Sequence, residues 1–275
     1  MDRYSNFELR KFFVSYWLFH SVLYNFAQAL NNRKKRRFVW AITNYYYSTM
    51  YIARLFLFLS TSKYFKRHID LSFFYVNRQP NGKILKLNNI GEIEEERGTL
   101  DIKKVKEKLN LNEKYLIKFG NFLENFRKLR NTNTYEPFII YAQENHTITN
   151  FLQKNVEKIE NICKRYVKDS CNIFLKFWKN QNEIFISLLR HDWLLPNTNK
   201  TIEKHGLNNK EIQLIINELN LSLNLIKLNK EKYEKLRKDF ENICKISNFN
   251  AKKDLISKVT TELNGVINNL IGGGE

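Results

Sequence analysis

A short polar segment, LRNTNTYEP at residues 129–137, follows a stretch with helical apolar spacing and carries the side chains best suited to chemistry. Arg130 is a permanent cation whose planar guanidinium can bind two phosphate oxygens at once, and Asn131 places an amide beside it. Helix interiors disfavour Asn and Thr, and the residue before a proline avoids the helical conformation. We therefore expect that something other than helix propensity places these residues here, and a guanidinium at this position can bind an anion. In the alternative interpretation the segment is only a helix end, where Asn131 caps and Tyr135 packs.

Chemistry at a phosphate also needs a group that moves protons. Tyr135 offers a hydroxyl, but a phenol with a pKa of about 10 is a poor base at neutral pH. Histidine suits this role better, because its pKa lies near neutrality. The candidates are His146, which follows the polar segment, and His68, in KYFKRH at residues 63–68. If neither acts, either the site cuts more slowly or it is a binding site that does not cut.

Two apolar stretches near the N-terminus must help to position these groups. Residues 5–30 place aromatic and aliphatic side chains three and four positions apart, which predicts an amphipathic helix. Residues 38–60 are apolar on most sides, which predicts a helix at the centre of a bundle. We expect the tyrosines of this central helix to be scaffold; they are Tyr46, Tyr47 and Tyr51.

The chain between the central helix and Arg130 mixes a turn signal with helical spacing. QPNGK at residues 79–83 marks a turn, and its flanking segments can form either a short hairpin or a loop. We expect an irregular excursion there. Residues 101–130 resume helical periodicity and predict two helices that lead to Arg130.

The central helix and the polar segment together resemble the HEPN family. Its members are small all-α domains whose tyrosine-rich second helix ends in a small residue and an arginine, as Ala53 and Arg54 do in YYSTMYIAR, and an arginine-polar motif follows later. The resemblance covers roughly residues 35–145. It implies a helical bundle, a dimer in which two motifs face each other, and metal-independent RNA cleavage. In that reaction the ribose 2′-hydroxyl attacks the adjacent phosphorus, the arginine stabilises phosphate charge and a histidine moves protons.

The resemblance assigns roles at three positions of the polar segment. Arg130 matches the motif arginine, Asn131 the adjacent polar residue, and Tyr135 stands where nuclease members keep their histidine. No arginine of this chain is followed by a histidine at the family's spacing. The nucleotidyltransferase-paired branch instead carries a tyrosine, an acidic residue and a proline, so Tyr135 is also a candidate for nucleotide modification. The predicted catalytic residues are Arg130, Asn131, Tyr135 and His146.

The chain is strongly basic. A formal net charge of +18 and a pI near 9.7 attract polyanions, and nucleic acid is the leading candidate partner. The run RKKRR is a candidate for phosphate contact, and the segment KYFKRH interleaves aromatic rings with cations in a manner suited to single-stranded RNA. The predicted RNA-binding residues are Arg33, Lys34, Lys35, Arg36, Arg37, Arg54, Lys63, Lys66, Arg67, His68 and Arg127.

The remaining composition bounds the class of protein. Only 9 glycines and 3 prolines in 275 residues predict an all-α architecture. Three cysteines without metal-ligand spacing predict buried thiols, and we expect no metal and no cofactor. No continuous apolar stretch reaches the length of a membrane span, so we expect a cytoplasmic protein that does not enter the membrane.

The second half also carries helical patterns. Residues 138–195 read as helix almost throughout, ending at Pro196, and Asn208 with Glu211 resembles a capping box. Tyr233, Leu236 and Phe240 have the spacing of a helical hairpin, and a last helix is expected after it. We expect a HEPN-like helical bundle over residues 1–150 and a helical extension over residues 151–275 that binds RNA or a protein partner.

Two functions follow from these patterns, and a third interpretation is a pure interaction scaffold, for which the heptad-like C-terminal stretch is the argument. The first is an RNA-directed HEPN-like endoribonuclease, independent of metal, acting as a homodimer in a toxin–antitoxin or antiviral defence system. Its protein partner would be a nucleotidyltransferase antitoxin or a larger effector. The alternative is a non-catalytic basic RNA-binding subunit of a ribonucleoprotein complex, which the missing motif histidine favours.

Overall fold

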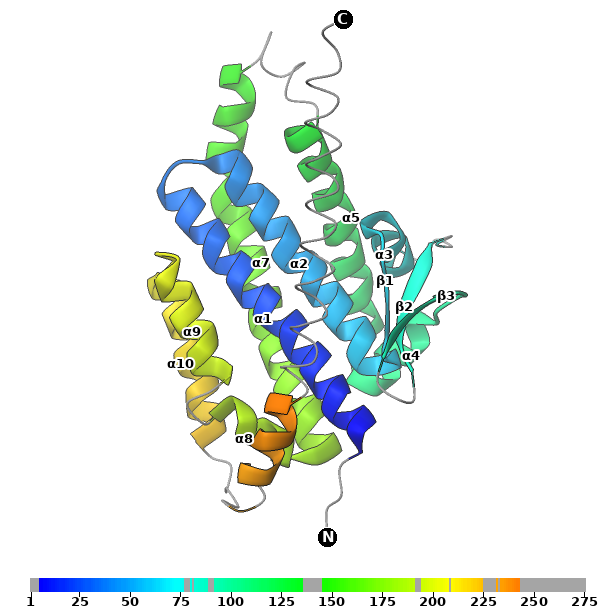
Figure 1. Cartoon of the computed structure of the whole chain (residues 1–275). Coiled ribbons are helices and arrows are strands. Elements are labelled where there is room, and N and C mark those ends of the chain that lie inside the picture. The colour runs from blue at the N-terminus through cyan, green and yellow to red at the C-terminus, as the bar shows by residue number, and fades with distance from the viewer. Residues whose placement is uncertain are drawn as a thin grey trace, which may run out of the picture. The chain divides into compact units, whose positions relative to one another are not determined.

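The computed structural model describes residues 5–76, 80, 82–88, 92–135, 145–190, 194–207, 209–224, 231 and 233–242. The fold is mainly all-α, as predicted, with a small three-stranded sheet beside the helices (Figure 1). The chain divides into two compact units, residues 1–228 and residues 229–275. The site lies in the first unit.

The centre of the first unit is a pair of long helices joined by a short basic turn. Helix α1 (Asn6–Lys34) begins with a capping box in which the Ser5 and Glu8 side chains each bind the other's backbone amide. Helix α2 (Phe38–Thr61) packs along α1, and the Ser48 hydroxyl donates to the Val22 carbonyl across the contact (2.9 Å). Both predicted N-terminal helices are thereby confirmed.

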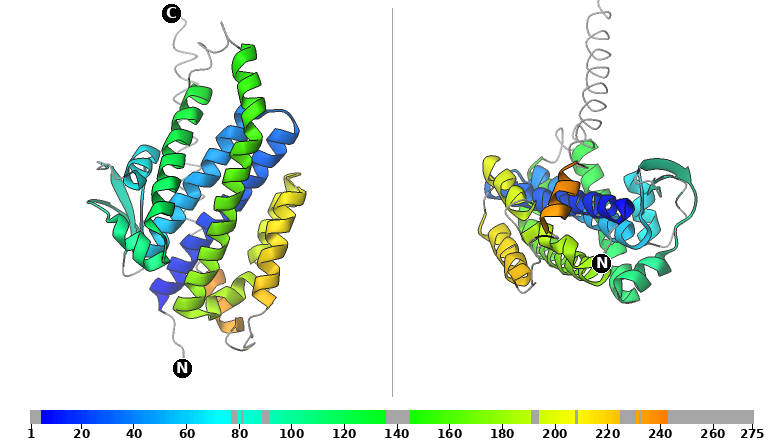
Figure 2. Two further views of the ribbon diagram at one scale, coloured as in Figure 1. Left: turned by 180° about the vertical axis from the view of Figure 1, so that it is seen from behind. Right: turned by 60° about the horizontal axis from the view of Figure 1, so that its bottom comes forward.

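Helix α7 (Asn145–Asn182) packs against this pair. Seen from behind (Figure 2), it crosses the α1 and α2 pair, and the sheet stands on the opposite side from α9 and α10. The Trp178 indole of α7 is buried and donates to the Ser15 hydroxyl of α1 (3.1 Å). Helix α7 runs unbroken through residue 150, and the domain division near that residue stays a prediction.

The prediction of an irregular excursion after the central helix is wrong. Strands β1 (Lys63–Phe65), β2 (Lys83–Leu87) and β3 (Ile93–Arg97) form an antiparallel sheet, and helix α3 (His68–Tyr75) lies between β1 and β2 in the chain. The strands are short, and lysines face glutamates across them, as Lys63 does Glu96. Such pairing depends on register, which a single-segment pattern does not contain.

Helices α4 (Ile102–Leu109) and α5 (Glu113–Tyr135) confirm the prediction of two helices before Arg130. Helix α5 continues past Asn131 and ends at Tyr135, within the polar segment. Asn131 therefore does not cap the helix. Packing explains why the helix continues past Asn131, because Phe126 and Arg130 are buried and hold this turn in place.

The remaining helices are α8 (Ile184–Arg190), α9 (Leu194–Lys204) and α10 (Lys210–Asn224). Pro196 lies in the first turn of α9, which tolerates proline, so the prediction that a helix ends there is wrong. The side chain that caps α10 is Asn209, whose Oδ1 accepts from the Glu211 amide (2.9 Å). Asn208 lies outside the described residues.

In the second unit, residues 233–242 are helical. The expected last helix lies outside the described residues. Cys163 and Cys171 are buried thiols, as predicted, and Cys244 lies outside the described residues. Across the described part of the chain, no helix has both the length and the apolar character that a membrane span requires.

Candidate functional site

Two neighbouring tyrosine rings of α2 hold Arg130 in place. The guanidinium carbon of Arg130 lies 5.5 Å from the ring centre of Tyr46 and 5.4 Å from that of Tyr47. Its Nη2 donates to the Tyr47 hydroxyl (2.7 Å), and its Nη1 donates to Oδ1 of Asn131 (2.9 Å). Arg130 is only 7% exposed. The polar segment therefore anchors α5 to α2 through the arginine, with cation–π and hydrogen-bond contacts together.

His68 reaches the same two rings from a third element. It is the first residue of α3, and its ring centre lies 5.8 Å from those of both Tyr46 and Tyr47. Burial, with smaller contributions from the positive charges of Arg54 and Arg130, lowers the pKa of His68 to about 4. The imidazole is therefore neutral at pH 7 and able to accept a proton.

Arg54, two turns beyond Tyr47 on α2, is a cation without an acidic partner. Its guanidinium carbon lies 5.8 Å from the ring centre of Tyr51 and 5.7 Å from that of Tyr64. Its Nη2 donates to the Lys66 carbonyl (2.8 Å), whereas its Nε is buried and has no hydrogen-bond partner among the described residues. Within that part of the chain no carboxylate pairs with Arg54. Burial lowers its pKa, but a guanidinium remains charged, so an anion here would relieve an unfavourable burial.

Four other predicted RNA-binding residues are paired with acids of their own chain. Arg127 makes two hydrogen bonds to the buried Glu124 (2.8 and 3.0 Å), and Arg67 makes two to Asp70 (2.6 and 3.0 Å). The other two pairs cross the sheet region, where Lys63 binds Glu96 and Lys66 binds Glu95. These charges are partly neutralised, and only Arg127 lies on the same helix as Arg130.

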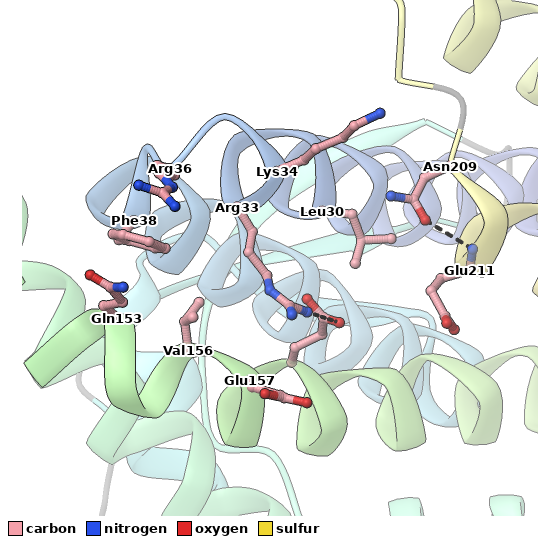
Figure 3. Close-up of a pocket in the computed structure, with 11 residues that line it drawn as sticks. Leu30, Arg33, Lys34, Arg36, Phe38, Gln153, Val156, Glu157, Asn209 and Glu211 are labelled. Carbon is pink, nitrogen blue, oxygen red and sulfur yellow. Dashed lines mark hydrogen bonds and ion pairs between the residues drawn. The ribbon is translucent and has the colours of Figure 1, made fainter. Parts of the chain in front are cut away.

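The basic run RKKRR lies at a second place, beside a pocket of about 520 Å³ between the end of α1, α7 and the start of α10 (Figure 3). Arg33 is directed toward α7, where it pairs with the buried Glu160, which also accepts from the Tyr45 hydroxyl. Glu157 and Glu211 also line the pocket. Three acids therefore offset its cations, which makes the pocket itself a poor phosphate site.

The rest of the basic run forms an exposed turn. Lys34, Lys35, Arg36 and Arg37 all face solvent, and none makes an ion pair with a described residue. This basic turn leads directly into the N-terminus of α2. It is therefore the part of the run best placed to meet a polyanion.

The other two predicted catalytic residues are Tyr135 and His146. Tyr135 is the last residue of α5 and His146 is the second residue of α7. The side chains of both lie outside the described part of the chain. Their catalytic assignment stays a prediction.

Comparison of the chain with protein-family profiles, with curated proteins and with solved structures gave no match. The HEPN resemblance therefore rests on the two sequence motifs. Their arrangement in space is a separate observation: the central-helix motif contributes Tyr47 and Arg54, and the polar segment contributes Arg130.

Sequence reasoning assigned Tyr47 to the scaffold, yet Tyr47 is the residue that joins the two motifs. A signal was present, because Tyr47, Tyr51 and Arg54 recur at helical spacing and so share one face. His68 was considered as a proton carrier, but only the structure brings it beside Arg130. Together these groups offer two cations for phosphate oxygens and one neutral base.

Proposed function

We propose that the chain is an RNA-directed protein that cleaves RNA without a metal ion at the site of Arg54, His68 and Arg130. The observation that carries the proposal is the position of His68, a neutral imidazole close enough to both guanidiniums for their charges to lower its pKa. A neutral imidazole can take the proton of the ribose hydroxyl and two cations can stabilise phosphate charge, although a pKa of about 4 makes His68 a weaker base than an ordinary histidine.

The proposed reaction uses the nucleophile that RNA already carries. The Nε2 or Nδ1 atom of His68 takes the proton of the ribose 2′-hydroxyl, and the 2′-oxygen forms a bond to the adjacent phosphorus. Arg54 and Arg130 stabilise the charge that grows on the non-bridging oxygens. The bond from phosphorus to the 5′-oxygen breaks, and that oxygen takes a proton from water. The products are a 2′,3′-cyclic phosphate and a free 5′-hydroxyl.

The resemblance to HEPN proteins extends the proposal to the whole molecule. It supports a homodimer that acts as a toxin or antiviral defence effector, paired with a nucleotidyltransferase or a larger effector. Nucleotide transfer to Tyr135 would add a charged group to the end of α5 that carries Arg130, and so would block the site. The net charge of +18 supports RNA as the partner.

The burial of Arg130 favours a second candidate function. Its Nη1 and Nη2 atoms already donate to Asn131 and Tyr47, as a structural arginine would do. In that case the chain binds RNA as a non-catalytic subunit of a ribonucleoprotein complex, through its basic turn and Arg54. The two candidates differ in one measurable property, which is strand cleavage.

The test is incubation of labelled single-stranded RNA with the protein in EDTA. We expect cyclic-phosphate ends from the wild type, and a loss of rate of about 100-fold or more in His68→Ala and in Arg130→Ala. Lys128→Ala is the matched control, because it removes an exposed cation from the same helix and should leave the rate unchanged. Circular dichroism checks that each variant is folded. Binding without cleavage by the wild type would select the second candidate.

A further inference from the structure

One face of α2 is only partly covered by the described residues: Trp40 is exposed, and the side chains that follow it along this face are half-buried. The side chains of residues 40, 44, 47, 51 and 54 recur at steps of four and three, so they lie in one row. Trp40 is 60% exposed, whereas the tyrosines Tyr45 and Tyr46 of the same helix are buried. We call this row the α2 track; it consists of Trp40, Asn44, Tyr47, Tyr51 and Arg54.

The α2 track connects the cations of the basic turn with the guanidinium of Arg54. Its N-terminal end adjoins the exposed basic turn of Lys34 to Arg37, and its C-terminal end is Arg54, beside His68. Fourteen residues of helix separate Trp40 from Arg54, so the track is about 21 Å long. No acidic residue belongs to it. The track therefore suits a polyanion and leads it to the proposed site.

The chemistry of the track favours a single-stranded nucleic acid over a protein. Flat aromatic rings between cations are the usual means of binding single strands, because bases stack on the rings while phosphates meet Lys or Arg. The Asn44 amide adds a donor and an acceptor for base edges. A protein partner would be met by an apolar patch depleted of charge, and the track is bounded by charge at both ends.

We propose that the α2 track binds the unpaired RNA that flanks the cleaved bond, with bases stacked on Trp40 and Tyr51. This inference rests on the proposed function and deepens it by naming the substrate as single-stranded. Duplex RNA keeps its bases stacked on one another and cannot place them on these rings. The phosphates of the bound strand lie toward the basic turn at one end and toward Arg54 at the other.

The test measures binding separately from cleavage. A 2′-O-methyl oligouridylate cannot be cut, because the nucleophile is blocked, and a fluorescein-labelled copy of it serves as the probe in fluorescence-anisotropy titrations. We expect the wild type to bind it, and a loss of affinity of about 10-fold or more in Trp40→Ala. Trp17→Ala is the matched control, since Trp17 of α1 is also exposed (43%) but lies outside the track.

Three results would contradict the proposed binding of RNA by the α2 track. They are equal affinity of Trp40→Ala and Trp17→Ala for the probe, no binding of the probe by the wild type, and equal affinity of the wild type for the probe and for a duplex of the same length.

Cleavage of a ribodinucleotide, which is too short to reach Trp40, is measured in parallel. If dinucleotide cleavage depends on His68 while Trp40 has no effect on binding, the track fails and the proposed function stands. If the probe binds through Trp40 but no RNA is cut, the proposed cleavage fails and the track stands.

Discussion

His68 and Arg130 lie within 6 Å of the same two tyrosine rings, those of Tyr46 and Tyr47, although they belong to α3 and α5. Partial burial and the charges of Arg54 and Arg130 both disfavour a positive charge on His68. A base held neutral beside two fixed cations is thus a product of three elements meeting at one face of α2.

The first prediction concerns the pKa of His68. Replacing Arg54 with Ala removes a nearby positive charge, so protonated His68 becomes less unfavourable and its pKa should rise from about 4 toward 6.5. NMR titration of the imidazole C–H signals measures this change. His20 is the internal control, because its pKa of about 4 is lowered by burial alone and should not respond to Arg54→Ala. A change in the pKa of both histidines, or of neither, would contradict the conclusion that the charge of Arg54 lowers the pKa of His68.

The second prediction concerns the pH dependence of cleavage. The active form of His68 is neutral, so kcat/KM should rise as pH increases through about 4 and reach a plateau well below neutrality. An ordinary histidine would instead give a midpoint of about 6.5. Rates on a ribodinucleotide from pH 3.5 to pH 8 at constant ionic strength test this, with circular dichroism to confirm folding at each pH. A midpoint near 6.5 would remove His68 from the role of base.

The third prediction concerns the contact that holds α3 against α5. A Cβ added at Gly120 would lie 2.3 Å from the Tyr75 carbonyl oxygen, so Gly120→Ala must push the two helices apart. We expect a loss of about 1–3 kcal/mol in the free energy of unfolding, together with lower cleavage, because α3 carries His68. Urea unfolding and the EDTA cleavage assay measure the two effects. Gly98→Ala is the control, since its Cβ would make only an ordinary contact with Ile84 (3.9 Å).

The fourth prediction concerns the buried acid beneath the basic run. Glu160 accepts from Arg33 and from the Tyr45 hydroxyl, and Tyr45 is fully buried. Glu160→Ala leaves that hydroxyl without its acceptor and should cost about 2–3 kcal/mol of stability, whereas Tyr45→Phe should cost about 1 kcal/mol. Thermal unfolding measures both. Glu157→Gln, at an exposed position one turn away on α7, should change stability by less than about 0.5 kcal/mol.

The long helices could be predicted from the sequence, but the sheet and the helix ends could not. Apolar spacing of three and four is a local pattern, so the sequence predicts α1, α2, α4 and α5 in their places. Strand β2 has only five residues, and its pairing with β3 depends on a register between segments separated by a turn. Helix α5 passes through residues that disfavour helix, because Arg130 gains tertiary contacts there.

The sequence by itself determined the helical class, the excess of positive charge and the polar segment that contains Arg130, because composition and spacing are properties of the chain. Only the tertiary structure decided which cations remain without an acid. Arg127 pairs with Glu124 of its own helix and Arg67, the residue before α3, pairs with Asp70, whereas Arg54 meets rings and a carbonyl. It also decided that His68 is the histidine beside Arg130. The physical reason is that the charge state and pairing of a side chain depend on burial and on neighbours from other elements, and these exist only after the helices have packed.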